Sequence, residues 1–512
     1  TYGGVPEADF ENAELIILWA ANPVETSLPN YGRRVMQAKA RGAKLVVIDP
    51  RFTKTAAKAD WHIPLRPGTD GALALGLAHV LIRENLYDKD FVERHTHGFA
   101  EFAAMVREYP PERVARITTV PVETIEKLAR LYATTKPTAL MSGNGVEQLT
   151  NTMQTVRAIQ ILPALTGNLG VKGGYIFTPN VAWSDMPLKG KYVGELIDKS
   201  VSRHKMFSGF SVVYPDLLDA IETDEPYPVK AVLCLGAPLT VLPQGDRYRE
   251  LLKKRLDLFV VHDLYMTSEA QIADIVLPAT SFLECSRLRS TRYKADPYTQ
   301  HIALQNRVAD PVGESRPDEE LFFELGRRLG MVELFPWQNA LEAAGAAIES
   351  LGLTLQDLTD NPGGKEWRYP ESEVVKFYEK TGFATPTKKV ELYNTTFEKN
   401  GYDPLPRYLE PAESPVSQPK LSREYPLVCV NGIKSILYSH TQFRTLSMLH
   451  DILPDPWVEL HPDKAAELGI GEGDLVLMAS PRGQVRLKAK VSAGISSPGV
   501  VFSAYGWGQA YV

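Results

Sequence analysis

Two aspartates stand at the ends of short apolar runs, and their residue type and position both suit ligand binding. Asp49 follows the run 45–48, and Asp263 ends the run 258–263. Apolar runs of this length predict buried strands of a parallel sheet, and such sheets bind ligands at the carboxyl ends of their strands. An ionised aspartate there accepts hydrogen bonds at two oxygens, which suits the paired N–H groups of a guanine or the hydroxyls of a ribose. A cap for the following helix is the alternative role.

The two aspartates belong to an internal repeat. The landmarks of each copy are a proline, two aspartates and a second proline: Pro23, Asp49, Asp60 and Pro64 in the first copy, and Pro238, Asp263, Asp274 and Pro278 in the second. The first interval is 26 residues in one copy and 25 in the other, the second is 11 in both, and the third is 4 in both. The repeat predicts two similar α/β lobes, which would hold two similar nucleotides or one two-headed ligand.

A loop at residues 65–71 leads directly into a predicted helix. Thr69 or Asp70 can cap this helix, which would leave free backbone N–H groups and the Arg66 side chain facing an anion. A plain capped turn is an equally good interpretation. Arg51 could bind a phosphate through two parallel hydrogen bonds, although exposed arginines more often do nothing of the kind. The chain lacks a G-x-G-x-x-G motif, so the ordinary dinucleotide fingerprint is absent.

Further candidate loops are rich in glycine or in polar side chains. The loops 142–145 and 166–174 bracket a predicted helix, and their glycines would let the backbone approach a bulky ligand, although most such loops are only turns. Near the C-terminus, the loop 438–444 gathers polar and cationic side chains, in a position where binding residues are often found. His440 lies in this loop, but a lone histidine is more often structural.

The pattern of predicted elements divides the chain into four parts. Helices are expected at 31–41, 72–82, 122–132 and 318–329, in alternation with strands, which favours parallel sheets. After residue 420 strand-like runs and glycine turns predict a small closed β barrel. Five prolines between residues 404 and 419 forbid regular structure there. The expected domains are a first α/β dinucleotide-binding lobe at 1–185, a second at 186–335, an irregular connection and proline-rich linker at 336–420, and the barrel at 421–512.

Composition is that of an ordinary globular protein. The chain has 512 residues, of which 44% are hydrophobic and 23% charged, with a formal net charge of −6 and with both signs of charge interspersed. This balance argues against nucleic-acid binding. No apolar run approaches the roughly 20 residues that a membrane span requires. The three cysteines lie far apart, which argues against a disulfide scaffold or a cysteine-ligated cluster. Because the chain begins at Thr1 and is soon in a strand–helix pattern, we expect it to be an internal piece of a longer protein, and its compartment is undetermined.

An ordered set of these motifs resembles the dimethyl sulfoxide reductase family of molybdenum and tungsten enzymes. The set comprises Asn22-Pro23, Asp49-Pro50-Arg51, the loop 65–70, Gly167-Asn168-Leu169-Gly170, Asp263, Thr267, Ala273-Asp274, Leu277-Pro278 and the barrel sequences 468–470 and 481–483. The resemblance implies an α/β fold with two pseudo-symmetric Rossmann-like parallel-sheet lobes plus a C-terminal double-psi-type β barrel. It also implies two molybdopterin guanine dinucleotides, one per lobe, around a molybdenum or tungsten ion.

The resemblance implies roles for individual residues. Asp49 and Asp263 resemble the acids that read the two guanines. The residues that resemble the family's contacts to one dinucleotide are Asn22, Pro23, Arg51, Arg66, Gly68 and Asp70. Those that resemble its contacts to the other are Ala237, Pro238, His262, Thr267 and Asp274. Gly145 and Gln148 match a loop near one pterin, and His440, Thr441 and Gln442 match the barrel loop that meets both pterins. The family's metal ligand and its iron–sulfur cysteine motif would precede Thr1, so no catalytic or metal-binding residue is expected here, and a 4Fe-4S cluster is expected only in that N-terminal domain.

The polysulfide and thiosulfate reductase-like branch and the acetylene hydratase-like branch are the most similar parts of that family. The stretches 225–230 and 389–406 resemble the latter branch in particular. The expected function is that of an oxidoreductase catalytic subunit, in which the metal site transfers oxygen, sulfur or electrons to a small-molecule substrate, with an iron–sulfur electron-transfer subunit as a possible partner. One alternative is a non-redox hydratase that uses the same cofactor as a Lewis acid. Another is a cofactor-binding fragment that is inactive on its own. The missing glycine fingerprint disfavours an NAD-dependent dehydrogenase.

Overall fold

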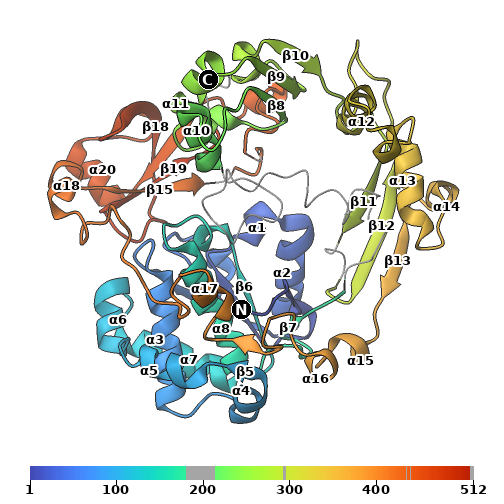
Figure 1. The fold of residues 1–512 in the computed structure, drawn as a ribbon. Helices are drawn as coiled ribbons and strands as arrows, with labels where there is room; N and C mark the ends of the chain where they lie inside the picture. Colours follow the sequence, from blue (N-terminus) through green and yellow to red (C-terminus); the bar gives the residue numbers. More distant parts are fainter. Residues whose placement is uncertain (180–213, 292–295, 434, 439, 508–512) are drawn as a thin grey trace. The chain divides into compact units, whose positions relative to one another are not determined.

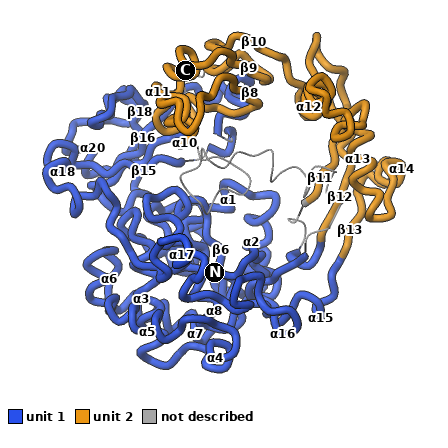
Figure 2. The backbone as a smooth tube through the Cα atoms, viewed as in Figure 1, with its two compact units in different colours: residues 1–179, 293–299, 368–505 blue, residues 180–292, 300–367, 506–512 orange. Residues whose placement is uncertain are grey.

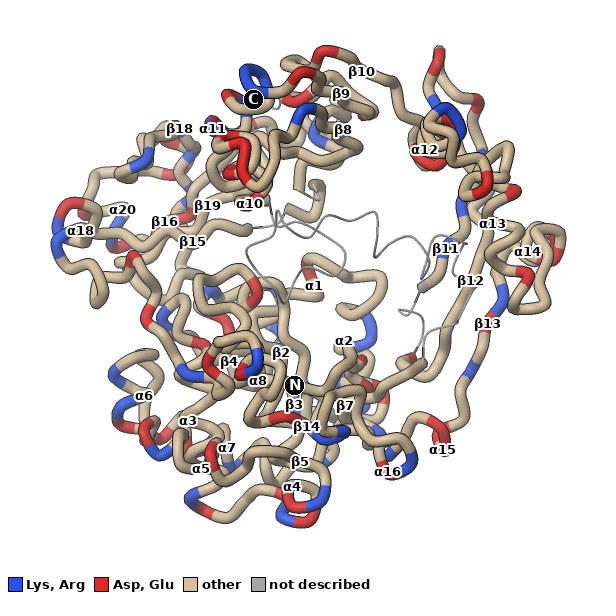
Figure 3. The backbone as a smooth tube through the Cα atoms, in the orientation of Figure 1, with Lys and Arg blue, Asp and Glu red and all other residues tan. Residues whose placement is uncertain are grey.

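The chain forms two compact units in a computed structural model, which describes residues 1–179, 214–291, 296–433, 435–438 and 440–507. Unit 1 consists of residues 1–179, 293–299 and 368–505, and unit 2 of residues 180–292, 300–367 and 506–512 (Figure 2). The expected boundary between the lobes, at residues 185–186, lies outside the described residues. Figure 3 shows acidic and basic residues interspersed along the backbone of each unit.

The core of unit 1 is a parallel sheet of four strands. These are β2 (Leu15–Trp19), β3 (Lys44–Ile48), β4 (Trp61–Ile63) and β6 (Thr138–Ser142), in the order β4-β3-β2-β6. All five residues of β2 are buried. A parallel sheet is normally covered on both faces, so its central strands read as continuous apolar runs. The apolar runs 15–19 and 45–48 therefore predicted these strands correctly.

Helices cover this sheet (Figure 1). The main ones are α2 (Arg33–Ala40), α3 (Asp70–Arg83), α7 (Val122–Thr134) and α8 (Thr152–Leu165). The predicted helices at 31–41, 72–82 and 122–132 are confirmed to within a few residues. Eleven of the fourteen residues of α3 are buried, because α3 packs against α6 (Pro111–Thr118), α7 and α8.

Smaller elements complete unit 1. They are β1 (Glu7–Ala8), α1 (Pro23–Thr26), α4 (Lys89–His95), β5 (Thr96–His97), α5 (Phe99–Val106), β7 (Tyr175–Ile176), α15 (Glu371–Val374), α16 (Tyr378–Thr381), β14 (Val390–Glu391), α17 (Thr395–Lys399), α18 (Pro419–Glu424), α19 (Ser447–His450) and α20 (Pro462–Leu468). The expected irregular connection at 336–420 is wrong over most of its length, because helices and strands occupy much of residues 340–399. Between residues 404 and 418 the structure has no helix or strand, and α18 starts at Pro419. Proline is tolerated in the first turn of a helix, where its missing N–H has no intrahelical partner.

A mixed, curled sheet forms the C-terminal part of unit 1. Its strands are β15 (Val428–Ile433), β16 (Trp457–Leu460), β17 (Leu475–Ser480), β18 (Gly483–Val491) and β19 (Val500–Ala504), in the order β15-β19-β16-β18-β17. Strand β16 is parallel to β18 and antiparallel to β19. Among the described residues no ladder joins β15 to β17, so the closed barrel stays a prediction.

Unit 2 contains a smaller parallel sheet and a second, partly antiparallel one. Strands β8 (Ala231–Leu235), β9 (Leu258–Asp263) and β10 (Ile275–Pro278) form the first, in the order β10-β9-β8. Its other elements are α10 (Tyr214–Thr223), α11 (Gly245–Lys254), β11 (Arg287–Thr291), β12 (Thr299–Gln305), α12 (Asp318–Arg328), α13 (Ala340–Glu349), α14 (Leu355–Asp360) and β13 (Lys365–Arg368). The predicted helix at 318–329 corresponds to α12.

The two parallel sheets are built alike at the turn after their first strand. Trp19 pairs with Ile48 and Leu235 with His262, and in each case the next residue has a positive φ, 49° at Ala20 and 52° at Gly236. The N–H of that residue donates to the residue before the aspartate, at 2.8 Å in the first copy and 3.1 Å in the second. The turn that leads to the proline is one residue longer in the first copy, since Trp19 to Pro23 spans 4 residues and Leu235 to Pro238 spans 3. The one-residue difference between proline and aspartate lies after the proline, and the strands themselves are in register.

Candidate cofactor sites

Asp49 lies at the carboxyl end of β3, at the edge of the first sheet where a ligand is expected. Its Oδ1 accepts a hydrogen bond of 2.9 Å from the backbone N–H of Arg51, and its Oδ2 makes no hydrogen bond to any residue that the structure describes. Burial raises the pKa of Asp49 to about 7. A desolvated carboxylate with an oxygen to spare can accept two N–H groups from a ligand.

Asp70 adds a second acid to the same edge. It is the first residue of α3 and is 6% exposed, and its Oδ1 accepts a hydrogen bond of 2.8 Å from Nε1 of Trp19, the last residue of β2. Burial raises the pKa of Asp70 to about 6, and the charge of Asp70 in turn adds to the rise in the pKa of Asp49. The two carboxyl groups are thus close enough to interact, which the sequence pattern did not predict.

The turn before α3 leaves the first N–H groups of that helix without a side-chain cap. The Thr69 hydroxyl donates backward to the carbonyl of Arg66 at 2.6 Å, and no side chain caps the helix. Gly68 has a φ of 79°, and a Cβ on it would lie 2.7 Å from Cγ of Pro411. Only glycine fits this turn. An uncapped N-terminus on a helix of fourteen residues suits an anion.

Arg66 does not present its whole guanidinium to this turn. Its Nη1 and Nη2 donate to the two carboxylate oxygens of Glu410 at 2.6 and 2.8 Å, and its Nε donates to the carbonyl of Ile117. Glu410 lies in the irregular segment before α18, and contact with Arg66 and Tyr408 lowers its pKa to about 2, although burial acts in the opposite direction. The Arg66–Glu410 ion pair therefore joins the irregular segment before α18 to the loop that follows β4.

Asn22 and Pro23 start α1 at the carboxyl end of β2, so they lie at the same edge as Asp49. The Asn22 side chain is engaged within the protein. Its Oδ1 accepts a hydrogen bond of 2.7 Å from the Thr55 hydroxyl, and its Nδ2 donates to Glu25 at 2.7 Å. The same hydroxyl also accepts from the N–H of Val24 at 3.1 Å. These bonds hold the loop after β2 against the loop after β3.

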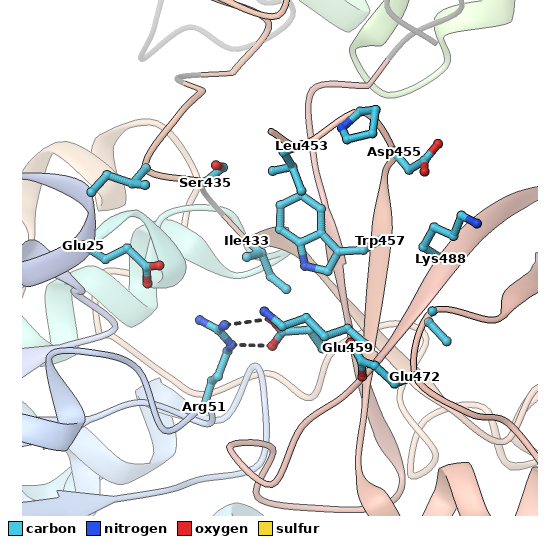
Figure 4. A pocket seen from close by; sticks show the side chains of 15 residues that line it. Glu25, Arg51, Ile433, Ser435, Leu453, Asp455, Trp457, Glu459, Glu472 and Lys488 are labelled. Atoms are coloured by element: carbon cyan, nitrogen blue, oxygen red, sulfur yellow. Dashed lines mark hydrogen bonds and ion pairs between the residues drawn. The ribbon is translucent and has the colours of Figure 1, made fainter. Parts of the chain in front are cut away.

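Arg51 forms a bidentate ion pair with a residue that sequence patterns did not single out. Its Nε and Nη2 donate to the two oxygens of Glu459 in β16, at 2.8 and 2.9 Å (Figure 4). Lys490 in β18 donates to the same carboxylate at 3.0 Å. The pair connects the C-terminal sheet to the first parallel sheet within unit 1.

A cavity of about 530 Å³ opens beside this pair. The Trp457 ring and the Leu453 side chain line it on one side, as Figure 4 shows, and Glu25, Arg51 and Lys488 contribute charges. The Trp457 Nε1 is buried and has no hydrogen-bond partner among the described residues. Charges of both signs line the cavity, so its electrostatics alone select no ligand.

Gly145 and Gln148 follow β6, which places them at the same sheet edge. Gly145 packs closely on Ala20, because a Cβ on Gly145 would lie 2.9 Å from the Ala20 Cβ. The Gln148 side chain is exposed and makes no hydrogen bond among the described residues. Its place at the edge of the sheet agrees with the role that the resemblance implied.

In unit 2, Asp263 and His262 end strand β9. Oδ1 of Asp263 accepts a hydrogen bond of 2.7 Å from the N–H of Leu264, and partial burial raises the pKa of Asp263. His262 is 2% exposed; its Nε2 is 3.2 Å from the carbonyl of Pro278, and its Nδ1 is 3.3 Å from a carboxylate oxygen of Asp318. Buried contacts of this kind give His262 a structural role at the edge where Asp263 is available to a ligand.

Ala237, Pro238 and Thr267 lie in the loops that follow β8 and β9. Glu269 ties these loops together, because its Oε1 accepts from both the N–H and the hydroxyl of Thr240 at 2.7 Å. Glu269 comes six residues after Asp263, as Thr55 comes six residues after Asp49. The same contact is made by a carboxylate in one copy and by a hydroxyl in the other, which is why the sequence repeat did not reveal it.

Asp274 lies at the opposite edge of its sheet from Asp263, just before β10. Its Oδ2 accepts from the N–H of Phe259 at 2.7 Å, near the beginning of β9. Asp60 accepts from the N–H of Leu45 in the same way, at 2.8 Å. The second aspartate of each copy therefore joins the starts of two strands. This gives the spacing of 11 residues a structural reason, because one acid marks each end of the strand pair.

The loop with His440, Thr441 and Gln442 follows β15. His440 has a φ of 61°, and its ring packs edge-on against Tyr505 at 5.1 Å between centroids. Arg444 fixes the loop, since its Nε donates to the carbonyl of His440 and its Nη2 to the carbonyl of Tyr505. Arg444 is 5% exposed and lies over the Tyr438 ring. Non-glycine residues with positive φ persist where surrounding contacts hold them, often at ligand sites.

Two family models match this chain. Residues 3–328 match the family model for molybdopterin oxidoreductases. The chain belongs to this family. Residues 429–511, which include the C-terminal sheet and Glu459, match the model for the molybdopterin dinucleotide binding domain. The family resemblance that the sequence motifs indicated is confirmed. Members of the family are enzymes, and their cofactor carries molybdenum or tungsten.

Three relatives are similar over most of the chain. Acetylene hydratase of Syntrophotalea acetylenica is 32% identical over 96% of this chain and 70% of its own length. The thiosulfate reductase molybdopterin-containing subunit of Salmonella typhimurium is 29% identical over 99% of this chain and 70% of its own. Dimethyl sulfoxide reductase of Escherichia coli is 30% identical over the whole chain and 69% of its own length. The solved structure of acetylene hydratase from Pelobacter acetylenicus matches with a TM-score of 0.86 and 30% identity, over 99% of this chain and 72% of that one.

In the described part of the chain, no helix is long and apolar enough to cross a membrane. The same residues contain no cluster of three or more His, Cys, Asp or Glu side chains arranged to hold a metal ion. Several residues important to the sites were not predicted from sequence: Trp19, Glu269, Glu410, Trp457 and Glu459. A signal for Glu459 was present in the sequence, where it is a charged residue between the apolar residues Val458 and Leu460.

Proposed function

We propose that the chain holds two molybdopterin guanine dinucleotides, one at the carboxyl edge of each parallel sheet, in a molybdenum or tungsten enzyme. The observation that carries the proposal is the pair of matched aspartates. Asp49 and Asp263 end equivalent strands in two sheets of equivalent register, and each is desolvated enough to raise its pKa. A guanine offers a ring N–H and an amino group side by side, which is the partner that such a carboxylate lacks.

The residues around each aspartate fit the rest of a dinucleotide. In the first site the uncapped N-terminus of α3 and the cations Arg51 and Arg66 would face phosphate groups. Asn22, Pro23, Gly68 and Asp70 would shape the turns that enclose the ligand. In the second site the turns around the ligand would be shaped by Ala237, Pro238, His262 and Thr267. Asp274 instead joins the starts of two strands of the sheet. Gly145, Gln148 and the loop with His440, Thr441 and Gln442 would lie near the pterins.

The finer architecture belongs to the same proposal. The two parallel sheets would be the centres of Rossmann-like, pseudo-symmetric lobes, and the curled C-terminal sheet would be a double-psi-type barrel. The domain division at residues 185, 335 and 420 is proposed on the same basis. Support comes from the matched turns after β2 and β8 and from the family models, which match residues 3–328 and 429–511 separately.

When bound, the metal would supply transfer of oxygen, sulfur or electrons, and the residues of this chain would bind and orient the cofactor and exclude water from it. We assign no metal ligand among the residues that the structure describes, and we propose that another part of the enzyme supplies the ligand and any 4Fe-4S cluster. An iron–sulfur subunit is a proposed partner, because one relative is itself described as the molybdopterin-containing subunit of its enzyme.

Nucleotide and metal analysis tests the proposal. The chain, purified anaerobically from a host that makes the cofactor, should release about two GMP per chain in acid, together with molybdenum or tungsten. Asp49→Asn and Asp263→Asn should each retain one GMP. Asp60→Asn is the matched control, because Asp60 has the same residue type in the same repeat but lies at the other edge of the sheet; it should retain two. Absence of GMP from the unmodified chain would refute the proposal.

A second function, hydration without net electron transfer, is supported by the similarity to acetylene hydratase, at 32% identity in sequence and a TM-score of 0.86. Here the metal would act as a Lewis acid toward water or the alkyne. Turnover of acetylene with no added electron donor or acceptor would establish this function. Turnover of a sulfur or oxygen compound that depends strictly on a reductant would instead establish the reductase function.

A further inference from the structure

Glu459 is a fully buried carboxylate in the middle of the C-terminal sheet. It is 0% exposed, and it accepts two hydrogen bonds from Arg51 and one from Lys490. Burial alone would raise the pKa of Glu459, but the hydrogen bonds and charges of Arg51 and Lys490 outweigh it and lower the pKa. An ionised group persists in such a place only when partners compensate its charge, so the three side chains form one unit.

The arrangement of the three side chains leaves one edge of the Arg51 guanidinium available. Nε and Nη2 of Arg51 donate to Glu459, while its Nη1 makes no hydrogen bond among the described residues (Figure 4). Two cations and one anion leave a net positive charge. The guanidinium is rigid and planar, so fixing one edge also fixes the direction of the other.

The backbone of Arg51 connects this unit to the acid proposed to read the first guanine. Its N–H donates to Asp49 at 2.9 Å. The C-terminal sheet also holds the main chain here, because Arg51 bridges to Ile495 and the N–H of Phe52 donates to the carbonyl of Gly494 at 2.6 Å. The loop after β3 is therefore held by the domain whose family model is named for dinucleotide binding.

From these contacts we infer that Glu459 is a positioning residue for the first dinucleotide: it holds Arg51 by one edge so that the free Nη1 edge binds a phosphate group. The inference rests on the proposed function. It goes beyond the proposed function by giving Glu459, on a strand of the C-terminal sheet, a defined part in retaining the nucleotide of the first site. The opposing view is that the pair only joins two parts of unit 1, with Arg51 binding nothing else.

A charge-swap variant separates the two views. Glu459→Gln should loosen one charge-assisted contact, so the first-site nucleotide should dissociate about tenfold faster or more, and the GMP content of the purified chain should fall from two to one. The double variant Arg51→Glu with Glu459→Arg restores an ion pair of the same type and should recover thermal stability. It places the cation on β16 instead of beside Asp49, so the GMP content should stay at one. Recovery of the second GMP in the double variant would overturn the inference.

The Asp263→Asn background identifies which nucleotide is lost. That variant should hold only the first-site GMP, so adding Glu459→Gln should reduce its GMP to near zero. Glu413→Gln is the matched control, because Glu413 also accepts a bidentate pair, from Arg482 at 2.6 and 2.9 Å, but on an exposed surface. It should retain two GMP. If Glu459→Gln does not fold, Arg51→Lys is the substitute variant. A lysine keeps the positive charge but has no second guanidinium edge to bind the phosphate, so this variant should also lose one GMP.

The results also separate this inference from the proposed function. Two GMP in the unmodified chain and two in Glu459→Gln would contradict the positioning role alone. No GMP in the unmodified chain would overturn both.

Discussion

The two parallel sheets share a sequence repeat, a strand register and a turn, yet they differ in how deeply the protein buries them. Strand β2 is buried along its whole length, whereas β8 has one fully buried residue out of five and β10 has none. In unit 1 four helices pack over the sheet, and the hydrophobic core around that sheet is one continuous cluster. The core around β8 and β9 is much smaller. One motif thus sits in two environments.

That difference changes the chemistry of the matched aspartates. Burial raises the pKa of Asp49 to about 7, with a further contribution from the neighbouring Asp70. The pKa of Asp263 is also raised by burial, and the charge of the nearby Glu269 adds to the rise, while backbone N–H groups and the neighbouring His262 oppose it. The comparison teaches that the repeat places each carboxylate, while the surrounding protein sets its proton affinity.

The largest expected difference between the two sheets is in packing. We expect Ile17→Ala, at a site 1% exposed, to cost about 3–4 kcal/mol of local stability. Leu233→Ala, at the equivalent half-buried position of β8, should cost about 1–2 kcal/mol, because less apolar surface leaves water there. Amide hydrogen exchange of peptides from β2 and β8 measures both. Equal losses of protection would contradict the difference in burial.

A smaller effect concerns charge. The folded-state pKa of Asp49 lies above its unfolded value, so the stabilising effect of its proton is complete at low pH and is lost as the pH rises through about 7. Asp49→Asn should therefore stabilise the nucleotide-free chain at pH 8 by about 2 kcal/mol and leave it unchanged near pH 4. Asp263→Asn should give a smaller gain. Denaturant-dependent hydrogen exchange at the two pH values is the measurement, and a loss of stability at pH 8 would contradict the pKa.

Nucleotide retention should show the same contrast. Because a guanine binds the ionised carboxylate, first-site affinity should fall about tenfold for each pH unit below the pKa of free Asp49, which is about 7. The second site should hold its GMP to lower pH. Dialysis of the chain between pH 8.5 and 5.5, with GMP counted in the retentate, should show one GMP leaving before the other. Asp263→Asn serves as the control, since it should keep only the early-leaving nucleotide. Simultaneous release would contradict the contrast.

The smallest expected effect tests the shared turn. Gly236 and Ala20 occupy the same left-handed position, and a Cβ on Gly236 would meet nothing within 4 Å. We expect Gly236→Ala to cost about 1 kcal/mol, which is the backbone strain that Ala20 already bears. Amide hydrogen exchange of the β8 peptide would measure this loss of stability. Gly330→Ala is the control, because Gly330 also has a positive φ and open space but lies outside the sheet, so β8 should be unaffected. No change in β8 would mean that the turn is not shared in detail.

Much of the framework could be predicted from the sequence because it depends on local patterns. Apolar runs gave β2, β3 and β9, and helical periodicity gave α3, since its buried side chains recur through the whole helix. The spacing of 11 residues between the paired aspartates was visible in the sequence, but only the structure showed that Asp60 and Asp274 join the starts of two strands. The proline-rich segment was expected to lack regular structure up to Pro419, but α18 begins at that residue because a proline can occupy the first turn of a helix.

By itself, the sequence determined the repeat, the parallel sheets, the family and the two aspartates at their edges. The tertiary structure alone decided which partners those sites acquire. Glu459 lies 408 residues from Arg51 and Glu410 lies 344 from Arg66, and no local pattern encodes such pairs. Burial was decided in the same way, because the solvent exposure of Asp49 depends on loops and helices from the whole of unit 1. Strand and helix patterns are short-range consequences of backbone geometry, whereas charge pairing and desolvation depend on what the fold brings together.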